Sequence, residues 1–204
     1  MIRSNKELHF YIKADRMMNR GCFSYSFKDK FCRLVAPDYI MNYLVALRNM
    51  EFYSLRGGVI SKMLYGYYAY RHKMLGIKLG FSINENSLGY GVVIPHHGTI
   101  VVGDNKIGNY AVLHTCTCIT GNGKTIGDGL YLATGAKITK KCTLGDGVTV
   151  AANAVVTSTF GSNILLAGVP AEKKRTSEAW YLSNGDVYFK RYQQIEQLKK
   201  EYGF

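Results

Sequence analysis

The chain has 204 residues, 47% of them hydrophobic, which is enough for one globular domain with appendages. Its formal net charge is +12, from 26 Lys and Arg against 14 Asp and Glu. This hydrophobic share excludes an intrinsically disordered chain, and no apolar run approaches the ~20 residues that a membrane-spanning helix needs.

The N-terminus and the cysteines indicate the compartment. The opening residues, MIRSNKELHFY, lack the apolar core of a signal peptide. The five cysteines contain no CxxC pair, which is typical of free thiols in a reducing compartment. We therefore expect a cytoplasmic protein. We expect no metal site, because Cys116-x-Cys118 lacks zinc-finger spacing and no second pair accompanies it.

The positive charge gathers near the N-terminus. Residues 1–80 hold 14 Lys and Arg against 5 Asp and Glu, whereas residues 81–171 hold 5 against 4. Such a field attracts phosphates on nucleotides, anionic lipids or nucleic acid, although a solubilising surface explains it equally well. No nucleic-acid-binding motif accompanies the charge, so we expect no nucleic-acid partner.

Start and stop signals predict four helices. Residues Ser4–Glu7 have the pattern of a capping box, and Gly21 follows as a helix end. A Gly57-Gly58 pair separates the second helix from the third. The predicted ranges are 4 to about 18, 38–55, about 60–75 and about 187–202.

The third predicted helix carries tyrosines at helical spacing beside basic residues. They are Tyr65, Tyr67, Tyr68 and Tyr70, with Arg71 and Lys73. Aromatic residues at this spacing are more often a face packed against a neighbouring element, and we favour this interpretation. Tyrosine with lysine and arginine also suits a lipid headgroup layer, so peripheral membrane contact is the minor alternative.

From Leu88 to Ala171 an aliphatic anchor recurs every six positions, with two blocks of seven residues and one of eight. The thirteen anchors are Leu88, Ile94, Ile100, Ile107, Leu113, Ile119, Ile126, Leu132, Ile138, Leu144, Val150, Val156 and Ile164. A period of six fits neither an α-helix nor an isolated strand. It fits a coil of short strands with one inward aliphatic residue per hexapeptide. Small residues recur four positions after an anchor, at Gly98, Ala111, Thr117, Ala136 and Ala154.

The repeat predicts a mainly β fold, a parallel β-helix. We divide the chain into a helical segment at 1–80, the β-helix at 81–171 and a basic, helical tail at 172–204. Every third hexapeptide lies on the same side of such a coil, which puts His96, Thr115, Thr134 and Ala152 in one column. Strands lie ~4.8 Å apart, so three coils span roughly 14 Å, the length scale of a pantetheine arm.

His96 and His97 are the only adjacent histidines, and strand alternation should point one of them outward. A neutral imidazole near pH 7 is a good general base for a hydroxyl. His114 is ambiguous, because it lies one coil above Pro95 and could line the same face. We interpret the histidines of the helical segment as structural.

Two further patterns are weaker. Cys116 and Cys118 could act as nucleophiles, but buried small side chains in the wall of the coil fit better. The Gly121–Lys124 segment has only the composition of a phosphate loop, and we interpret it as an outward bulge.

The β-helix region resembles a known family. The stretch GFSINENSLGYGVVIPHHGTIVVGDNKIG, the stretch ITGNGKTIGDGLYLATGAKI and the closing AGVPA resemble the serine acetyltransferase-like branch of the hexapeptide acyltransferases. The opening KELHFYIKADRMM is similar to members associated with polysaccharide genes. The resemblance implies a left-handed β-helix, a homotrimer, and acetyl-CoA bound in a cleft between neighbouring subunits.

The resemblance also implies roles for individual residues. The family's H-x-G-T/G-I-V motif falls on residues 96–101, which makes His96 the catalytic base and His97 the second choice. The residues implied to bind acetyl-CoA are Ala133, Thr134, Gly135, Ala151, Ala152, Gly168, Lys173 and Arg175. The candidate substrate residues are His114, Glu85 and Asn86. No metal and no covalent enzyme intermediate are required.

The chain departs from serine acetyltransferases in its acceptor motifs. Pro95 stands where they have an Asp before the catalytic His, and the segment Ser82–Glu85 is one residue shorter than their D-I-H-P motif. Their R-H-P segment and their C-terminal isoleucine are both missing, the latter because the chain ends in Phe204. These departures favour an acceptor other than free L-serine.

The sequence thus predicts an acetyl-CoA-dependent O-acetyltransferase. The expected acceptor is a hydroxyl on a surface-polysaccharide sugar or its precursor. The alternatives are a serine O-acetyltransferase of cysteine biosynthesis and, from another class, a non-catalytic β-helix that binds or scaffolds.

Overall fold

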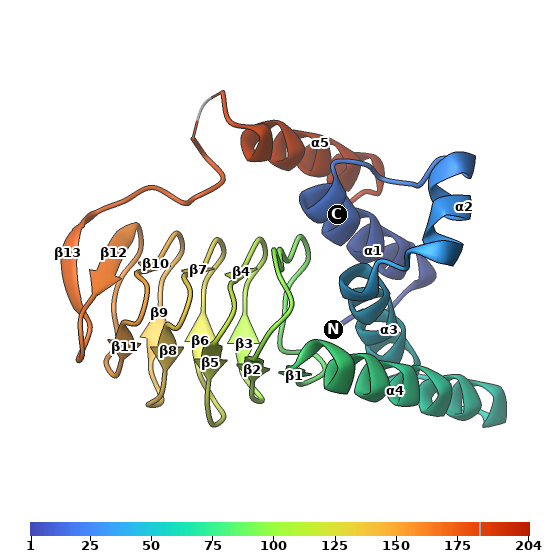
Figure 1. Ribbon diagram of the computed structural model, residues 1–204, viewed down its shortest axis with the longest axis horizontal. Coiled ribbons are helices and arrows are strands. Elements are labelled where there is room, and N and C mark those ends of the chain that lie inside the picture. The colour runs from blue at the N-terminus through green and yellow to red at the C-terminus, as the bar shows by residue number, and fades with distance from the viewer. Residues whose placement is uncertain (184) are drawn as a thin grey trace.

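The computed structural model describes residues 1–183 and 185–204. Figure 1 shows a stack of coils with helices gathered at its N-terminal end. The helices are α1 (Asn5–Arg20), α2 (Phe27–Val35), α3 (Tyr39–Ser54), α4 (Val59–Leu79) and α5 (Val187–Glu201). The strands are β1 (Phe81–Ile83), β2 (Ile100–Val102), β3 (Lys106–Ile107), β4 (Val112–Leu113), β5 (Thr117–Ile119), β6 (Thr125–Ile126), β7 (Tyr131–Leu132), β8 (Lys137–Ile138), β9 (Thr143–Leu144), β10 (Thr149–Val150), β11 (Val155–Val156), β12 (Ile164–Ala167) and β13 (Glu172–Thr176).

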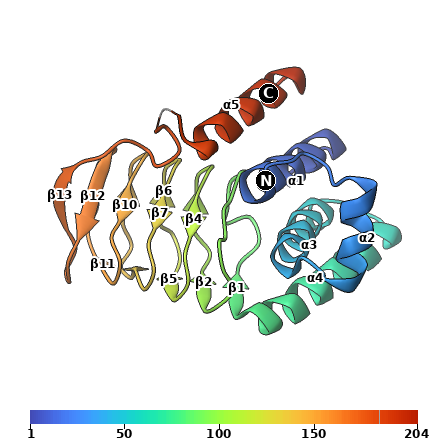
Figure 2. The same ribbon diagram turned by 45° about the horizontal axis from the view of Figure 1, so that its top comes forward.

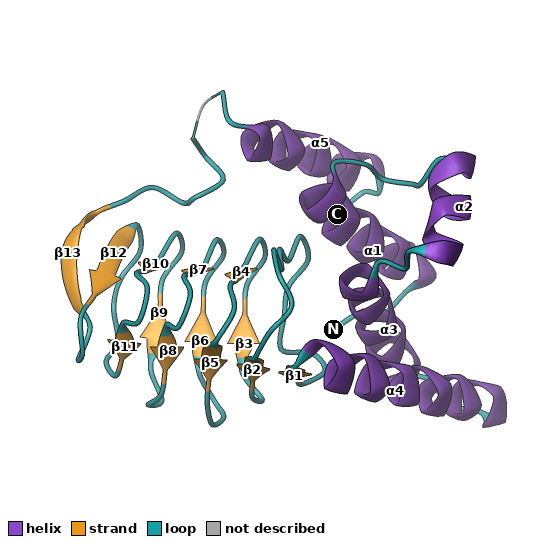
Figure 3. Ribbon diagram, in the orientation of Figure 1, coloured by secondary structure: helices purple, strands orange, loops and turns teal. Residues whose placement is uncertain are grey.

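The predicted parallel β-helix is confirmed. The strands form three sheets, in the orders β1-β2-β5-β8-β11, β3-β6-β9 and β13-β12-β10-β7-β4, and every pairing between successive coils is parallel. Figure 3 shows how short these strands are beside the connecting corners. All thirteen predicted anchors are buried, and they form the core of the coil.

The register of the first complete coil differs from the prediction. Ile100 pairs with Thr117, and Val102, not Ile100, pairs with the anchor Ile119. Seven positions separate Val93 from Ile100, whereas five separate their partners Val112 and Thr117. Two extra residues therefore lie in the corner before Ile100. As a result Ile100, rather than the predicted Gly98, occupies the small-residue position of this coil.

The helices match their start and stop signals, with one omission. Ser4 caps α1 in a capping box, Gly21 ends it in the left-handed conformation, and Asp38 caps α3. Helix α2 was not predicted from the sequence, although a second capping box, Ser26 with Asp29, precedes it. α4 runs one turn beyond its predicted end and stops at Gly80.

The outer face of α4 is apolar and exposed. Six of its side chains, spaced alternately three and four residues apart, are largely exposed: Ile60, Met63, Tyr67, Tyr70, Met74 and Ile77. Tyr65 and Tyr68 instead pack against the core, as the packing interpretation expected. Among the described residues, no helix is both long and apolar enough to span a bilayer. Peripheral membrane contact through the outer face of α4 stays a prediction.

The tail folds back along the molecule. Its first part, β13, pairs antiparallel with β12, which the polar run Glu172–Thr176 did not suggest. Its last part, α5, lies beside α1 at the opposite end of the coil (Figures 1 and 2). Aromatic side chains hold α5 there: Tyr110 of the coil packs on Tyr192 of α5 and donates a hydrogen bond to Glu196 at 2.6 Å.

A buried ion cluster joins the helices to the first coil. Arg48 of α3 is fully buried, pairs with Asp15 of α1 at 2.8 Å and with Glu51 at 3.1 Å, and donates to the backbone oxygens of Leu88 and Gly89. Asp15 in turn accepts a hydrogen bond from the Val92 amide at 3.0 Å.

We expect Arg48→Met to lower the free energy of unfolding by about 3–5 kcal/mol, because it leaves two buried carboxylates unpaired. Arg56→Met is the matched control, since Arg56 stacks over the Phe52 ring at 3.9 Å without a carboxylate partner in the described structure. We expect it to change stability by about 0.5 kcal/mol or less. Urea unfolding of both variants measures the difference, and equal losses would contradict the assignment.

Candidate active site

The predicted catalytic histidines lie in the longer corner. His96 and His97 are both exposed, and they are in the loop that carries the two extra residues. The backbone on either side of them is fixed: the Ile94 amide donates to Asn19 Oδ1 at 3.1 Å, and the Gly98 amide donates to the Leu79 oxygen at 2.9 Å. The loop therefore projects a pair of imidazoles from a backbone held by α1 and α4.

The two histidines have different neighbours. His96 lies close enough to His114 to contribute to lowering its pKa. His97 instead lines a cavity of about 420 Å³ with residues of α1, α2 and α3. Neither imidazole forms a hydrogen bond with a carboxylate or any other group of the described residues.

His114 joins the histidine corner, as one of its two interpretations expected. Its Nε2 lies 2.8 Å from the Tyr131 hydroxyl of the next coil. Burial, and then the charge of His96, lower the pKa of His114 below its ordinary value. A half-buried, neutral imidazole thus stands beside the exposed His96.

The predicted cofactor residues stack below this corner. Val150 pairs with Leu132, so the turns that follow them lie one above the other. The amides of Ala133 and Ala151 already donate to the backbone oxygens of the next coil, at 3.0 and 2.8 Å. The amides of Thr134 and Ala152 form no hydrogen bond with any described residue. Of the predicted cofactor residues in these two turns, Thr134 and Ala152, both exposed, are therefore the ones with a backbone N–H available to a ligand.

The last coil and the tail extend the same corner. Gly168 follows β12 with φ +105, a conformation that favours glycine. Gly135 has φ +75, and a Cβ there would meet the Asn153 side chain, so this position excludes a larger residue. Lys173 and Arg175 are exposed on β13, paired with Leu166 and Leu165.

The remaining candidate substrate residues lie elsewhere in the chain. Glu85 and Asn86 follow β1, at the corner between the first and second sheets, and are not brought to His96 within one chain. The Asn86 amide donates to Glu51 at 2.8 Å. Burial and the nearby Glu51 carboxylate raise the pKa of Glu85.

Two weaker patterns are resolved. Lys124 is buried and its Nζ donates to the Thr120 oxygen, so the Gly121–Lys124 segment is a bulge of the coil rather than a phosphate loop. Cys116 is exposed with φ +61, which corrects the expectation of a buried wall residue, whereas Cys118 is half-buried.

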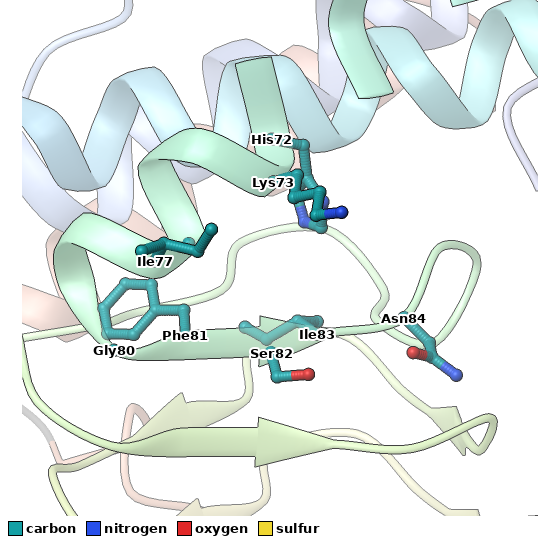
Figure 4. A pocket seen from close by; sticks show the side chains of 9 residues that line it. His72, Lys73, Ile77, Gly80, Phe81, Ser82, Ile83 and Asn84 are labelled. Atoms are coloured by element: carbon teal, nitrogen blue, oxygen red, sulfur yellow. The ribbon is translucent and has the colours of Figure 1, made fainter. Parts of the chain in front are cut away.

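A second cavity, of about 430 Å³, lies between α4 and β1, with His72 and Ser82 among its lining residues (Figure 4). His72 stacks on the Tyr43 ring at 4.4 Å, and burial lowers its pKa to about 4. This histidine stays neutral at physiological pH, and its contacts are those of a packed side chain.

Comparisons with known proteins support the fold. No known family model matches the chain, and no curated protein matches its sequence. Among solved structures it is similar to serine acetyltransferase from Brucella abortus strain S19, with a TM-score of 0.61 at 20% identity over 84% of this chain and 69% of that one. A Neisseria gonorrhoeae serine acetyltransferase in complex with serine gives 0.58 at 22% identity over 82% and 67%.

A serine acetyltransferase in complex with CoA gives a TM-score of 0.55 at 20% identity, over 81% of this chain and 67% of that one. The chain thus spans about two thirds of the length of these structures. The predicted resemblance to the serine acetyltransferase-like branch is confirmed for the fold.

We expect His114 to titrate below pH 6.5, because burial penalises its charged form and a charged His96 opposes it further. His96→Gln should raise the pKa of His114, whereas His97→Gln should leave it unchanged. NMR titration of the imidazole protons measures both. A rise in the His97 variant alone would reverse the placement of the two histidines.

Proposed function

We propose that the protein transfers an acetyl group from acetyl-CoA to an acceptor hydroxyl. The observation that carries this proposal is the extended histidine corner, which projects His96 at the head of a column of exposed small turns. The column has the length of a pantetheine arm, at roughly 4.8 Å per coil. The likeness to serine acetyltransferases, one of them crystallised with CoA, supports the same chemistry.

In the proposed reaction His96 acts as a general base. Its imidazole takes the proton from the acceptor hydroxyl while that oxygen attacks the thioester carbonyl. The carbonyl–sulfur bond then breaks, and the thiolate of CoA leaves and receives the proton from the imidazolium. The exposed amides of Thr134 and Ala152 are the donors that this chain offers to the bound thioester arm, because the other amides of those turns are used within the coil.

The acceptor that we favour is a hydroxyl on a surface-polysaccharide sugar or its precursor. The departures from the acceptor motifs of serine acetyltransferases favour the sugar. L-serine is the second candidate, and the solved structures support it at least as well, because they include serine acetyltransferases crystallised with serine. Turnover with L-serine against turnover with sugar acceptors separates the two. A non-catalytic β-helix is the third candidate, and direct measurement of acetyl-CoA binding tests it.

The first expected outcome concerns the histidine pair. His96→Ala should lower kcat by about 10²–10⁴-fold, because a general base contributes about that much. His97→Ala should lower kcat by less than about tenfold and should mainly change the KM for the acceptor. Steady-state kinetics with unchanged circular dichroism spectra test this. An inactive His97→Ala beside an active His96→Ala would exchange the two assignments.

The second expected outcome concerns the turns below the histidines. Ala133→Leu and Ala151→Leu should each raise the KM for acetyl-CoA, because a bulky side chain would cover the path of the pantetheine arm. Thr139→Leu is the control, since Thr139 directly follows an anchor at a different corner of the coil. A lower melting temperature with an unchanged KM would show that these alanines only pack the coil.

The third expected outcome concerns assembly. One coil face offers a shallow groove, whereas small-molecule sites usually bury most of the ligand, so we propose that acetyl-CoA sits between two subunits of a homotrimer. Sedimentation should give about three times the chain mass of 22.8 kDa. A stable monomer with full activity would contradict the shared site.

A further inference from the structure

The cavity beside His97 is walled by helices rather than by the repeat. Arg20 at the end of α1, Arg33 in α2, and Asp38 and Tyr39 at the start of α3 line it together with His97. Its volume, about 420 Å³, is within the range of small-molecule sites. Apart from His97, the wall of this cavity comes from the helical segment and not from the repeat that forms the proposed cofactor path. The cavity is therefore open to a different ligand.

The charges around this cavity are unbalanced. One carboxylate, that of Asp38, faces two guanidinium groups: Arg20 Nε and Nη2 at 2.6 and 2.7 Å, and Arg33 Nη1 at 2.6 Å. Lys78 does not line the cavity, but its Nζ lies 3.6 Å from the centre of the ring of Tyr39, which does. The wall therefore carries an excess of positive charge beside His97.

Asp38 holds the two arginines in place, and each arginine keeps N–H groups that have no hydrogen-bond partner among the described residues. Burial opposes ionisation of Asp38, but the hydrogen bonds from Arg20 and Arg33 outweigh it and lower its pKa to about 2. Arg33 also stacks on the Tyr25 ring at 3.6 Å. Arg20 Nη1, Arg33 Nε and Arg33 Nη2 form no hydrogen bond with any described residue. Their side chains are 36% and 28% exposed, so these N–H groups can reach a ligand.

We propose that this cavity binds an anionic group, a phosphate or a carboxylate, and that this group belongs to the acceptor whose hydroxyl reaches the histidine loop. Arg20 and Arg33 are the binding residues. The assignment to the acceptor rests on the proposed acetyl transfer. Guanidinium groups suit this task, because they remain charged and bind phosphate and carboxylate with paired hydrogen bonds.

A purely structural role for the ion pairs leads to a different outcome. If Arg20 and Arg33 only fastened α1 and α2 to the start of α3, replacing either would lower the melting temperature and leave anion binding unchanged. The proposal predicts weaker anion binding, including in a variant that keeps the charge and the fold. Measurements of binding and of melting therefore separate the two roles.

The experiment measures binding of inorganic pyrophosphate to the full chain by calorimetry. Arg33→Gln and Arg20→Gln should each weaken binding about tenfold, as loss of one charge-assisted contact does. Arg33→Lys should lie between Arg33→Gln and the unmodified protein. Arg71→Gln is the matched control, because Arg71 is exposed on α4 and bonds the Tyr67 hydroxyl at 3.1 Å; it should bind normally.

Arg175→Gln examines the other basic surface, on β13. Loss of pyrophosphate binding in Arg175→Gln with normal binding in Arg33→Gln would overturn the proposal, as would unchanged binding in Arg33→Lys and Arg33→Gln together.

Acceptor kinetics then identify the source of the anion. The acceptors are UDP-N-acetylglucosamine, glucuronate, L-serine and uncharged N-acetylglucosamine. Arg33→Gln should raise the KM of a charged acceptor about tenfold and leave that of the uncharged sugar unchanged. Equal effects on both, with transfer intact, would overturn the anion site and leave the transferase standing. Weakened pyrophosphate binding in Arg33→Gln without transfer to any acceptor would refute the transferase and keep the site.

Discussion

The buried guanidinium of Arg48 closes the open end of the β-helix. A coil of parallel strands bonds each turn to the next, so its first turn presents backbone groups with no preceding turn to satisfy them. The oxygens of Leu88 and Gly89 are two such groups, and Arg48 donates to both. Asp15, ion-paired to Arg48, accepts from the Val92 amide. A single ion cluster thus supplies acceptors and donors where a further coil would otherwise lie.

The same closure positions the candidate site. Asn19, one turn along α1 from Asp15, bonds both the Val92 oxygen and the Ile94 amide. The residue after Ile94 begins the histidine corner, and the far side of that corner is bonded to Leu79 at the end of α4. The corner can be two residues longer than its successors because helices, rather than a preceding coil, hold its backbone. The cap of the coil and the candidate site therefore share one junction.

The sequence could predict the coil because its period follows directly from how the coil packs. One aliphatic residue per hexapeptide points into a narrow core. The sequence could not predict the first register, because Ile100 is aliphatic and falls six residues after Ile94, so the period continues unbroken through the two extra residues. It missed β13, whose polar residues carry no strand alternation and whose partner strand is decided by tertiary contact. The motif located His96, but nothing local indicated that α2 would stand beside His97.

Because the repeat predicts the coil but not the helices beside His97, the acceptor is hard to infer from the repeat. Successive corners of the coil are nearly equivalent, which suits the proposed binding of an extended pantetheine arm along the axis. The proposed acceptor approaches the histidine corner from outside the repeat, where helices form the wall of the cavity beside His97. Arg20 and Arg33 come from two helices, and both are ion-paired to Asp38. Under the proposed function, acceptor specificity is thus carried by the least repetitive part of the chain, which also holds the backbone of the histidine corner through Asn19 and Leu79.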